Sequence, residues 1–254
     1  MENLFDVSRK IALLTGSSRG IGKALAKGLA QAGCTVILNG TNRNNLKTSV
    51  DEFKEEGFNV YGYVFDVTNE KEVNESLEQI QKEVGLIDIL VNNAGVQIRG
   101  PLENFSYLDW RKIIDTNLSG AYLVSKAVVK TMIERKKGKI INICSVQSEL
   151  ARPMITPYTA SKGGLRNLTR GMATEWGKHN IQVNGIAPGY FKTEMTKALY
   201  EDEKFDAWLR SRTPANRWGQ PEELIGTLIF LSSKASDYIN GQIIYVDGGM
   251  TVCV

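Results

Sequence analysis

Short apolar runs alternate with longer amphipathic stretches along nearly the whole chain. The apolar runs predict strands, and they are IALLT, TVILN, NVYGYVF, DILVNN, KIINIC, IQVNGIA and QIIYVD. Several are apolar on both faces, as expected for strands buried between two layers of helices. Segments such as GKALAKGLAQAG and NEKEVNESLEQIQKEVG have the period of amphipathic helices. The alternation predicts an α/β fold: a doubly wound parallel sheet of about seven strands with helices on both faces.

Composition and charge narrow the class of protein. The chain has 254 residues, 42% hydrophobic and 23% charged, with no linker, repeat or low-complexity tract. We therefore predict one domain over residues 1–254. The first residues lack the pattern of a signal peptide, and no segment approaches the roughly 20 apolar residues that span a bilayer. The three cysteines are far apart and the net charge of +3 is dispersed. These features favour a cytoplasmic protein that binds no membrane, nucleic acid or metal.

A glycine-rich turn follows the first predicted strand. In TGSSRGIG, Gly16 permits a tight turn, Gly20 lets the backbone approach a phosphate, and Gly22 allows close packing of helix on strand. The helix that follows directs its free N–H groups and positive dipole end toward the same point. A turn of this kind between a strand and a helix predicts a dinucleotide site.

The second predicted strand ends without the acid that commonly binds the adenosine ribose of NAD. Gly40 takes that place, Thr41 and Arg43 follow it, and Arg19 lies in the glycine turn. Residues 7–50 contain seven cations and no acid. A solvated basic helix face would have this composition. Arginine, however, pairs bidentately with a phosphate that a carboxylate would repel, so we predict NADP(H) in preference to NAD(H).

Two further strand ends carry candidate contacts to the coenzyme. Asp66, after the third strand, is placed to accept a hydrogen bond from the adenine amino group, although it is also a candidate helix cap. The sequence NNAG closes the fourth strand with small residues, where a flat ring must lie close to the backbone. Its candidate contacts are Asn93, Ala94 and Gly95.

Proton transfer at neutral pH needs a group other than histidine, because the chain has a single histidine, His179, which we interpret as structural. Tyr158 and Lys162 stand four residues apart and share a helix face. A cation about 4 Å from the phenol contributes on the order of 4 kcal/mol at an effective dielectric of 20. That energy would lower the tyrosine pKa by up to about three units. Ser145, at the end of the fifth strand, would hydrogen-bond the substrate oxygen. We therefore expect Tyr158 to act as acid and base.

Asn117 is the fourth candidate for catalysis. It lies within a predicted helix, where asparagine commonly faces solvent; as a functional residue it would hold a water that leads to Lys162. Each feature has an ordinary structural explanation, since Tyr–Lys pairs are common on helix surfaces and a serine can cap a helix. The combination is what favours catalysis.

The combined motifs resemble those of the short-chain dehydrogenase/reductase family. TGSSRGIG is similar to its glycine motif and NNAG to its ring-supporting motif, and the resemblance covers essentially the full chain. Its catalytic set corresponds to Asn117, Ser145, Tyr158 and Lys162. The resemblance implies a single Rossmann-like NAD(P)-binding domain, and a homotetramer built on two long helices and the C-terminal strand. Further coenzyme contacts that it implies are Ser18, Ile21, Val67, Tyr158, Lys162, Pro188, Gly189 and Thr193.

A narrower resemblance is to the bacterial gluconate 5-dehydrogenases of that family, also called 5-keto-D-gluconate 5-reductases. It is carried by NICSVQSELARPMITPY, GIAPGYFKTEMTKALYEDEKFDAWLRSRTPANRWGQPEELIG and FLSSKASDYINGQIIYVDGGM. It implies reversible, NADP(H)-dependent interconversion of D-gluconate and 5-keto-D-gluconate by hydride transfer. One departure is Gly40, where some of these enzymes carry an acid that suits NAD.

A sugar-acid substrate needs a cation for its carboxylate and polar groups for its hydroxyls. The candidate cations are Arg152, Arg99 and Lys192, and the candidate partners of the hydroxyls are Gln147 and Glu149. Ser145 and Tyr158 would contact the reacting oxygen. Residues 190–214, polar and rich in charge, are predicted to form a mobile lid over the substrate.

Other functions fit parts of the pattern. The same chemistry would serve a 3-oxoacyl thioester reductase or another keto-sugar or polyol reductase. A serine hydrolase would use Ser145 as nucleophile with Lys162 as base, although the glycine turn and the 13-residue spacing from Ser145 to Tyr158 argue against it. A nucleotide-sensing binding protein would keep the fold without turnover.

Overall fold

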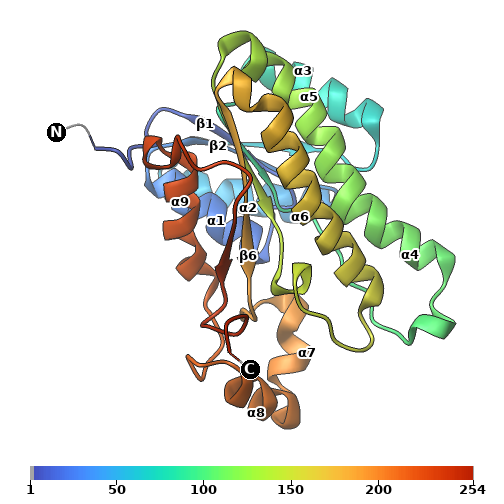
Figure 1. Ribbon diagram of the computed structural model, residues 1–254. Helices are drawn as coiled ribbons and strands as arrows, with labels where there is room; N and C mark the ends of the chain where they lie inside the picture. The colour runs from blue at the N-terminus through green and yellow to red at the C-terminus, as the bar shows by residue number, and fades with distance from the viewer. Residues whose placement is uncertain (1–2, 254) are drawn as a thin grey trace.

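The computed structural model describes residues 3–253, so residues 1, 2 and 254 of the predicted domain lie outside the described part. Seven strands form one parallel sheet in the order β3-β2-β1-β4-β5-β6-β7 (Figure 1). The predicted doubly wound parallel sheet is confirmed. The strands are β1 (Ile11–Leu14), β2 (Thr35–Gly40), β3 (Val60–Val64), β4 (Ile89–Asn92), β5 (Gly138–Ile143), β6 (Ile181–Pro188) and β7 (Ile243–Val246).

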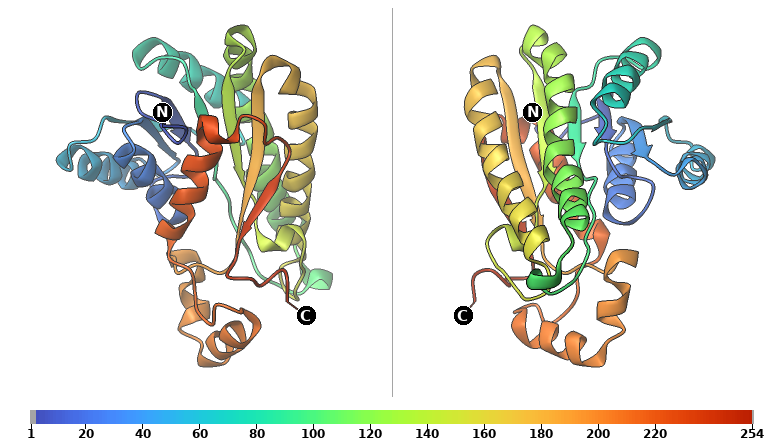
Figure 2. Two further views of the ribbon diagram at one scale, coloured as in Figure 1. Left: turned by 60° about the vertical axis from the view of Figure 1, so that its left-hand side comes forward. Right: turned by 90° about the vertical axis from the view of Figure 1, so that its right-hand side faces the viewer.

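Helices cover both faces of the sheet (Figure 2). Helices α1, α2 and α9 lie on one face, and α3, α5 and α6 lie on the other. Within residues 3–253, no helix combines the length and hydrophobicity needed to cross a bilayer. The helices are α1 (Gly20–Gln31), α2 (Arg43–Glu55), α3 (Glu70–Glu83), α4 (Tyr107–Ile114), α5 (Gly120–Arg135), α6 (Thr156–Trp176), α7 (Lys197–Tyr200), α8 (Glu203–Arg212) and α9 (Ile225–Ser232).

The strands divide their side chains between two hydrophobic cores. In β1, Ala12 and Leu14 point into the core beneath α1, α2 and α9, whereas Leu13 points into the core beneath α3, α5 and α6. This alternation follows from the two-residue period of a strand. It explains why the strands read as continuously apolar in the sequence.

Helices α7 and α8 project beyond the carboxyl ends of the strands (Figures 1 and 2). Both helices belong to the predicted lid, residues 190–214, whose aromatic side chains pack together and against Trp218, which follows it. The ring centroids of Tyr190 and Trp218 lie 5.8 Å apart, and those of Phe205 and Trp208 lie 5.1 Å apart. Trp218 is almost fully buried and its indole N–H donates to Asp206. The lid is therefore a folded unit held by aromatic packing, and its mobility stays a prediction.

Candidate active site

The glycine turn between β1 and α1 leaves room for a ligand on one side only. Gly16 has a φ of +60°, and a Cβ there would lie 2.7 Å from the Cα of Ala94. Gly20 has a φ of +57°, but a Cβ there would meet no atom within 4 Å. The first turn of α1 contains no acidic residue, and Arg19 at its N-cap makes no side-chain capping bond. The open side thus presents free N–H groups and fits a phosphate.

Thr15 and Asn93 fix this turn to the end of β4. The Thr15 hydroxyl accepts hydrogen bonds from the backbone N–H groups of Asn93 and Ala94, each at 3.0 Å. The Asn93 amide donates to the carbonyls of Thr15, at 3.0 Å, and Gly16, at 2.8 Å. Asn93, predicted to support a coenzyme ring, therefore also supports the glycine turn. Thr15 was not among the sequence candidates.

Asn39 is a second support that sequence reasoning missed. Its side chain is buried in β2, accepts a hydrogen bond from the Gly16 N–H at 3.1 Å, and donates to the carbonyls of Tyr63 and Phe65. It thereby ties the glycine turn to the end of β3. The available signal was an amide at the end of the apolar run TVILN, where burial demands hydrogen-bond partners.

Two other predicted residues of the glycine turn have structural contacts. The Ser18 carbonyl accepts a hydrogen bond from the Ser49 hydroxyl at 2.8 Å, which joins the turn to α2. Ile21 packs on the core beneath α1, and a Cβ on Gly22 would lie 2.4 Å from the Asn93 amide nitrogen. Gly22 therefore serves the close packing that its place in the motif predicts.

The predicted phosphate corner is less compact than the sequence suggested. Arg19 forms an ion pair with Glu194 at 3.1 Å, and both side chains are about 70% exposed. Arg43 opens α2 and borders a surface groove over β3 and α3. Within the described chain, Arg43 has no ion pair. Thr41 is exposed, and Gly40 is buried, where a Cβ would lie 3.1 Å from the Ser18 hydroxyl oxygen.

Asp66 lies at the carboxyl end of β3, as predicted, in a local turn. Its carboxylate accepts hydrogen bonds from the N–H and the hydroxyl of Thr68, at 2.9 and 2.8 Å. Asn69, rather than Asp66, caps α3. Val67 is buried, and a Cβ on Gly120 would lie 2.7 Å from it. The adenine contact of Asp66 stays a prediction.

Asn117 lies in a π-helical turn, Asp115–Ser119, between α4 and α5. Such turns are rare and frequently mark functional sites. The side chain is buried; it accepts from the Val96 N–H at 2.8 Å and donates to the Val96 carbonyl and the Ser161 hydroxyl, both at 3.0 Å. Its amide hydrogens are thus fully used in joining the loop after β4 to α6. Gly95, in that loop, lies beside Asn117.

Ser145, Tyr158 and Lys162 converge where β5 meets α6. Ser145 caps the short turn Val146–Ser148, and its hydroxyl accepts from the Gln147 N–H at 3.1 Å. Tyr158 and Lys162 lie on the first two turns of α6. Lys162 is buried, its ammonium donates to the Ile143 carbonyl at 2.6 Å, and it lies 5.7 Å from the centroid of the Tyr158 ring.

The pKa values of this pair differ from the sequence-based expectation. Burial raises the pKa of Tyr158 to about 12, and a hydrogen bond with Ser145 opposes the rise. Burial lowers the pKa of Lys162 to about 8. The expected lowering of the tyrosine pKa by Lys162 is wrong for the free protein, because the ammonium contacts a carbonyl and desolvation of the phenolate dominates. At neutral pH the phenol is protonated and the lysine is charged.

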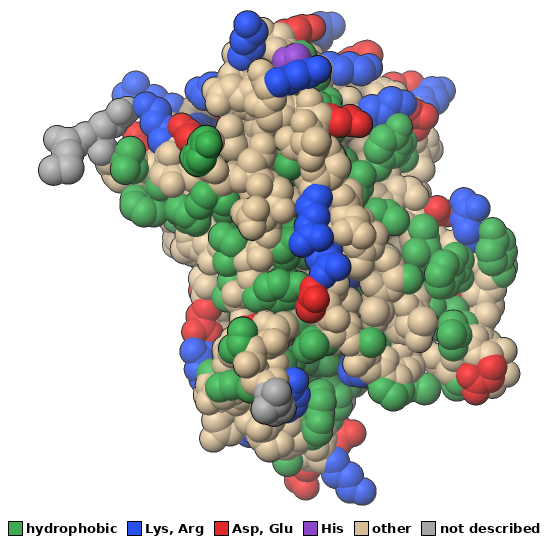
Figure 3. Space-filling model, viewed as in Figure 1, with side chains coloured by type: hydrophobic (Ala, Val, Ile, Leu, Met, Phe, Trp, Pro, Cys, Tyr) green, Lys and Arg blue, Asp and Glu red, His purple; other side chains and the backbone are tan. Residues whose placement is uncertain are grey.

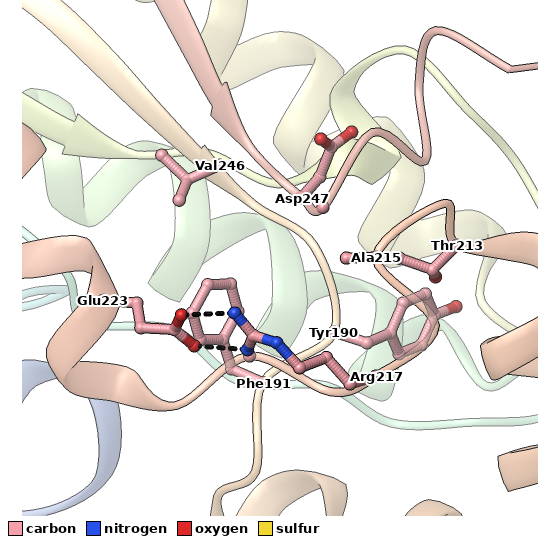
Figure 4. Close-up of a pocket in the computed structure, with 10 residues that line it drawn as sticks. Tyr190, Phe191, Thr213, Ala215, Arg217, Glu223, Val246 and Asp247 are labelled. Atoms are coloured by element: carbon pink, nitrogen blue, oxygen red, sulfur yellow. Dashed lines mark hydrogen bonds and ion pairs between the residues drawn. The ribbon is translucent and has the colours of Figure 1, made fainter.

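The segment after β6 lies against the end of β7. The Gly189 N–H donates to the Val246 carbonyl at 2.9 Å, and a Cβ on Gly189 would lie 2.8 Å from the Cα of Asp247. Pro188 ends β6, and Thr193 caps the turn Glu194–Thr196. Beside this segment, at the base of the predicted lid, is a small pocket lined by Tyr190, Phe191, Val246 and Asp247 (Figure 4). Arg217 and Glu223 form a two-pronged ion pair across it.

Two of the predicted substrate cations lie together. The Arg152 guanidinium donates to the Tyr190 hydroxyl at 3.0 Å and lies 5.6 Å from the centroid of the Phe205 ring, on the lid. The Gly100 N–H donates to the Met154 carbonyl at 3.0 Å, which joins the loop of Arg99 to that of Arg152. Burial and the neighbouring Arg152 lower the pKa of Arg99. Among residues 3–253, neither arginine pairs with an acid.

The other substrate candidates have different surroundings. Gln147 is buried, and its Oε1 has no hydrogen-bond partner within the described chain. Glu149 pairs with Arg166 and accepts a hydrogen bond from Tyr245, so its carboxylate is already engaged. The Lys192 ammonium lies 5.7 Å from the centroid of the Tyr200 ring, within the lid.

Comparison with known proteins agrees with this geometry. Residues 16–251 match the family model described as enoyl-(acyl carrier protein) reductase. The chain is 55% identical to gluconate 5-dehydrogenase of Gluconobacter oxydans (strain 621H), covering 98% of each chain. It is 54% identical to 5-keto-D-gluconate 5-reductase of Escherichia coli (strain K12) over the full length of both.

A solved structure is similarly close. It is a gluconate 5-dehydrogenase from Burkholderia cenocepacia J2315 in complex with NADP and tartrate, and it is 51% identical with a TM-score of 0.96. The match covers 99% of this chain and 98% of the other. Sequence and fold therefore agree with the motifs: the chain belongs to the short-chain dehydrogenase/reductase family.

Proposed function

We propose that this chain is an NADP(H)-dependent oxidoreductase that interconverts D-gluconate and 5-keto-D-gluconate. The observation that carries the proposal is the convergence of Ser145, Tyr158 and Lys162 at the end of β5, on the same sheet edge as the glycine turn. Identity above 50% over the full chain to enzymes named for these two sugar acids supports the substrate.

The residues present fit a dinucleotide. The open side of Gly20 and the uncapped first turn of α1 would hold the pyrophosphate, and Arg19 and Arg43 would attract a 2′-phosphate. Asp66 with Val67 would lie at the adenine. The nicotinamide end would lie against Asn93, Ala94, Gly95, Pro188, Gly189 and Thr193. The bound coenzyme supplies the hydride in reduction and accepts it in oxidation.

Tyr158 would handle the proton. In reduction, its protonated phenol donates to the substrate oxygen, which Ser145 holds by a hydrogen bond. A pKa of about 12 in the free protein means that the acid form is present throughout the physiological pH range. In oxidation the phenolate is needed, and the Lys162 charge, 5.7 Å from the ring centroid, would attract it, although desolvation of the phenolate outweighs this attraction in the free protein. Lys162 then serves to balance charge as the proton moves.

The substrate carboxylate would lie between Arg99 and Arg152. Two guanidinium groups on loops that hydrogen-bond to each other repel, and the described chain places no acid between them. A carboxylate there would relieve the repulsion and pair with the arginines. This feature favours a sugar acid over a neutral keto-sugar or polyol. The acyl-thioester alternative is retained because the family model bears an acyl reductase name.

The hydrolase and sensor alternatives are less well supported. In the described chain the Ser145 hydroxyl and the Lys162 ammonium share no hydrogen bond, because each bonds to a backbone group instead. A nucleophile and its base should be within such reach. A sensor would have no need of a half-buried tyrosine and a buried lysine on consecutive turns of one helix.

We also propose a cytoplasmic homotetramer. Tyr107, Leu108 and Tyr122 expose 70%, 80% and 45% of their surface. Figure 3 shows apolar side chains gathered in the region of α4 and α5. Strand β7 is an open sheet edge. An exposed apolar surface and an unpaired edge strand both favour burial against another copy.

The proposed reaction is tested by NADPH oxidation with 5-keto-D-gluconate. We expect faster turnover than with NADH, 3-oxoacyl thioesters or neutral keto-sugars. Tyr158→Phe should lower kcat by roughly 100-fold or more, the usual contribution of a general acid, with an unchanged circular dichroism spectrum. A folded Phe variant with the full rate would contradict the role of Tyr158, and no turnover of the wild type with any keto-acid would contradict the proposed function.

The pKa of Lys162 predicts a pH-dependent stability. Because its pKa falls from 10.5 to about 8 on folding, the folded chain binds fewer protons than the unfolded chain between these values. Stability from this group should therefore rise as the pH increases from about 8 to 10.5. The measurement is the melting temperature of the wild type minus that of Lys162→Met. This difference should increase as the pH rises from about 8 to 10.5. A constant difference would contradict the pKa.

Arg152 is predicted to set the Michaelis constant for the sugar acid. Arg152→Met should raise KM for 5-keto-D-gluconate at least tenfold, equivalent to about 1.4 kcal/mol, because the carboxylate loses a charged partner. KM for a neutral keto-sugar should not rise. Lys54→Met, which removes an exposed cation from α2, is the matched control. An unchanged KM in the Arg152 variant would place the carboxylate elsewhere.

Arg43 is predicted to distinguish the two coenzymes. Arg43→Ala should raise KM for NADPH about tenfold, near 1.4 kcal/mol, and leave KM for NADH within a factor of two. Lys47→Ala removes a neighbouring exposed cation that is paired with Asp51, and serves as the control. Equal effects on NADPH and NADH would show that Arg43 does not contact the 2′-phosphate.

A further inference from the structure

Ser148 joins the turn that carries Ser145 to the helix that carries Tyr158 and Lys162. Its side chain is 6% exposed. The Ser148 hydroxyl donates to the backbone carbonyl of Lys162 at 2.9 Å and accepts from the Ser145 N–H at 3.3 Å. One buried hydroxyl thus bridges the backbones of two proposed catalytic residues that are 17 positions apart in the sequence.

This bridge completes a closed set of bonds around Lys162. The lysine ammonium donates to the Ile143 carbonyl at 2.6 Å, and the lysine carbonyl accepts from Ser148. Ile143 and Ser148 lie on either side of Ser145 in the chain. Both the side-chain ammonium and the backbone carbonyl of Lys162 are therefore bonded to the segment that contains Ser145.

The bridge uses a backbone acceptor that α6 leaves available. The Lys162 carbonyl lies inside α6, and its second lone pair is free to accept a bond from outside the helix. The neighbouring ion pair of Glu149 with Arg166 also links the turn to α6, but the Glu149 side chain is 54% exposed. An exposed pair contributes little to fixing geometry, whereas a buried hydrogen bond is costly to break.

We propose that Ser148 is a positioning residue that sets the Ser145 hydroxyl against the Tyr158 phenol. This role of Ser148 rests on the proposed function in one respect: the Ser145 hydroxyl and the Tyr158 phenol must act on the same substrate oxygen. The two hydroxyls must reach the same atom, and they are carried by different elements, a turn and a helix. A displacement of about 1 Å between such groups can cost roughly 100-fold in rate. Ser148 prevents that displacement by bonding the two backbones directly.

The experiment compares three substitutions of Ser148. Ser148→Ala removes the bridge and should lower kcat about tenfold, with KM for 5-keto-D-gluconate and the NADPH dissociation constant changed less than twofold. Ser148→Thr keeps the hydroxyl and should retain most of kcat. Ser148→Cys replaces the hydroxyl with a slightly larger thiol that donates weakly, and should fall between them. It also provides the test if the Ala variant does not fold.

Ser232→Ala is the matched control. Ser232 is fully buried and its hydroxyl has no partner in the described chain, so its removal should leave kcat unchanged. A second readout is the alkaline limb of the reduction rate. The bond with Ser145 lowers the pKa of Tyr158, so a displaced Ser145 should move that limb to higher pH in the Ala variant.

Three results would overturn the proposal: full kcat in folded Ala and Cys variants, a Thr variant no better than Ala, or a rise in KM with kcat unchanged. Failure of the proposed function is separate. If the wild type does not reduce 5-keto-D-gluconate, the same variants are compared on whichever carbonyl substrate the wild type reduces.

Discussion

The buried ammonium of Lys162 is the interaction on which the arrangement of the site depends. Removing a charge from water costs several kcal/mol unless it is compensated, and the compensation here is the Ile143 carbonyl at 2.6 Å. That bond can form only if α6 lies close against the end of β5. The same closeness places Tyr158, one helical turn earlier, beside Ser145. A pKa of about 8 leaves the lysine charged at neutral pH, so the restraint persists under physiological conditions.

The sheet brings the remaining parts of the site to one edge. Because all strands are parallel, the glycine turn, Asn93, Ser145 and Gly189 follow four strands at their carboxyl ends. Such an edge contains tight turns whose backbone groups point inward, and these groups need partners. Polar side chains, most of them buried, supply them in the part of the structure described above. The supports for the turns are Thr15, Asn39, Asn93, Asn117 and Ser148.

The features predicted correctly are those that short stretches of sequence determine, such as strands and helices. Hydrogen-bond partners and pKa values depend on packing between distant parts of the chain, and these were predicted poorly. The alternation of strands with helices and the i, i+4 relation of Tyr158 and Lys162 follow from periodicity. The partner of Asn39 or Ser148 depends on residues far along the chain, which no spacing reveals. The pKa of Tyr158 was wrong because the argument placed an ammonium beside the hydroxyl and left out desolvation. The lid was predicted from its polar and charged residues, and the aromatic side chains that pack among them were overlooked.

The charged side chains of the candidate active site connect the proposed proton chemistry with the proposed substrate. Lys162, Arg99 and Arg152 place three cations near Tyr158 and Tyr190, and within residues 3–253 none of them pairs with an acid. Such a site is strained electrostatically until an anion enters it. A sugar acid brings one carboxylate, which would offset one of the two arginine charges. The charge of Lys162 would then stay available to the phenol, which is the division of labour that reversible proton transfer requires.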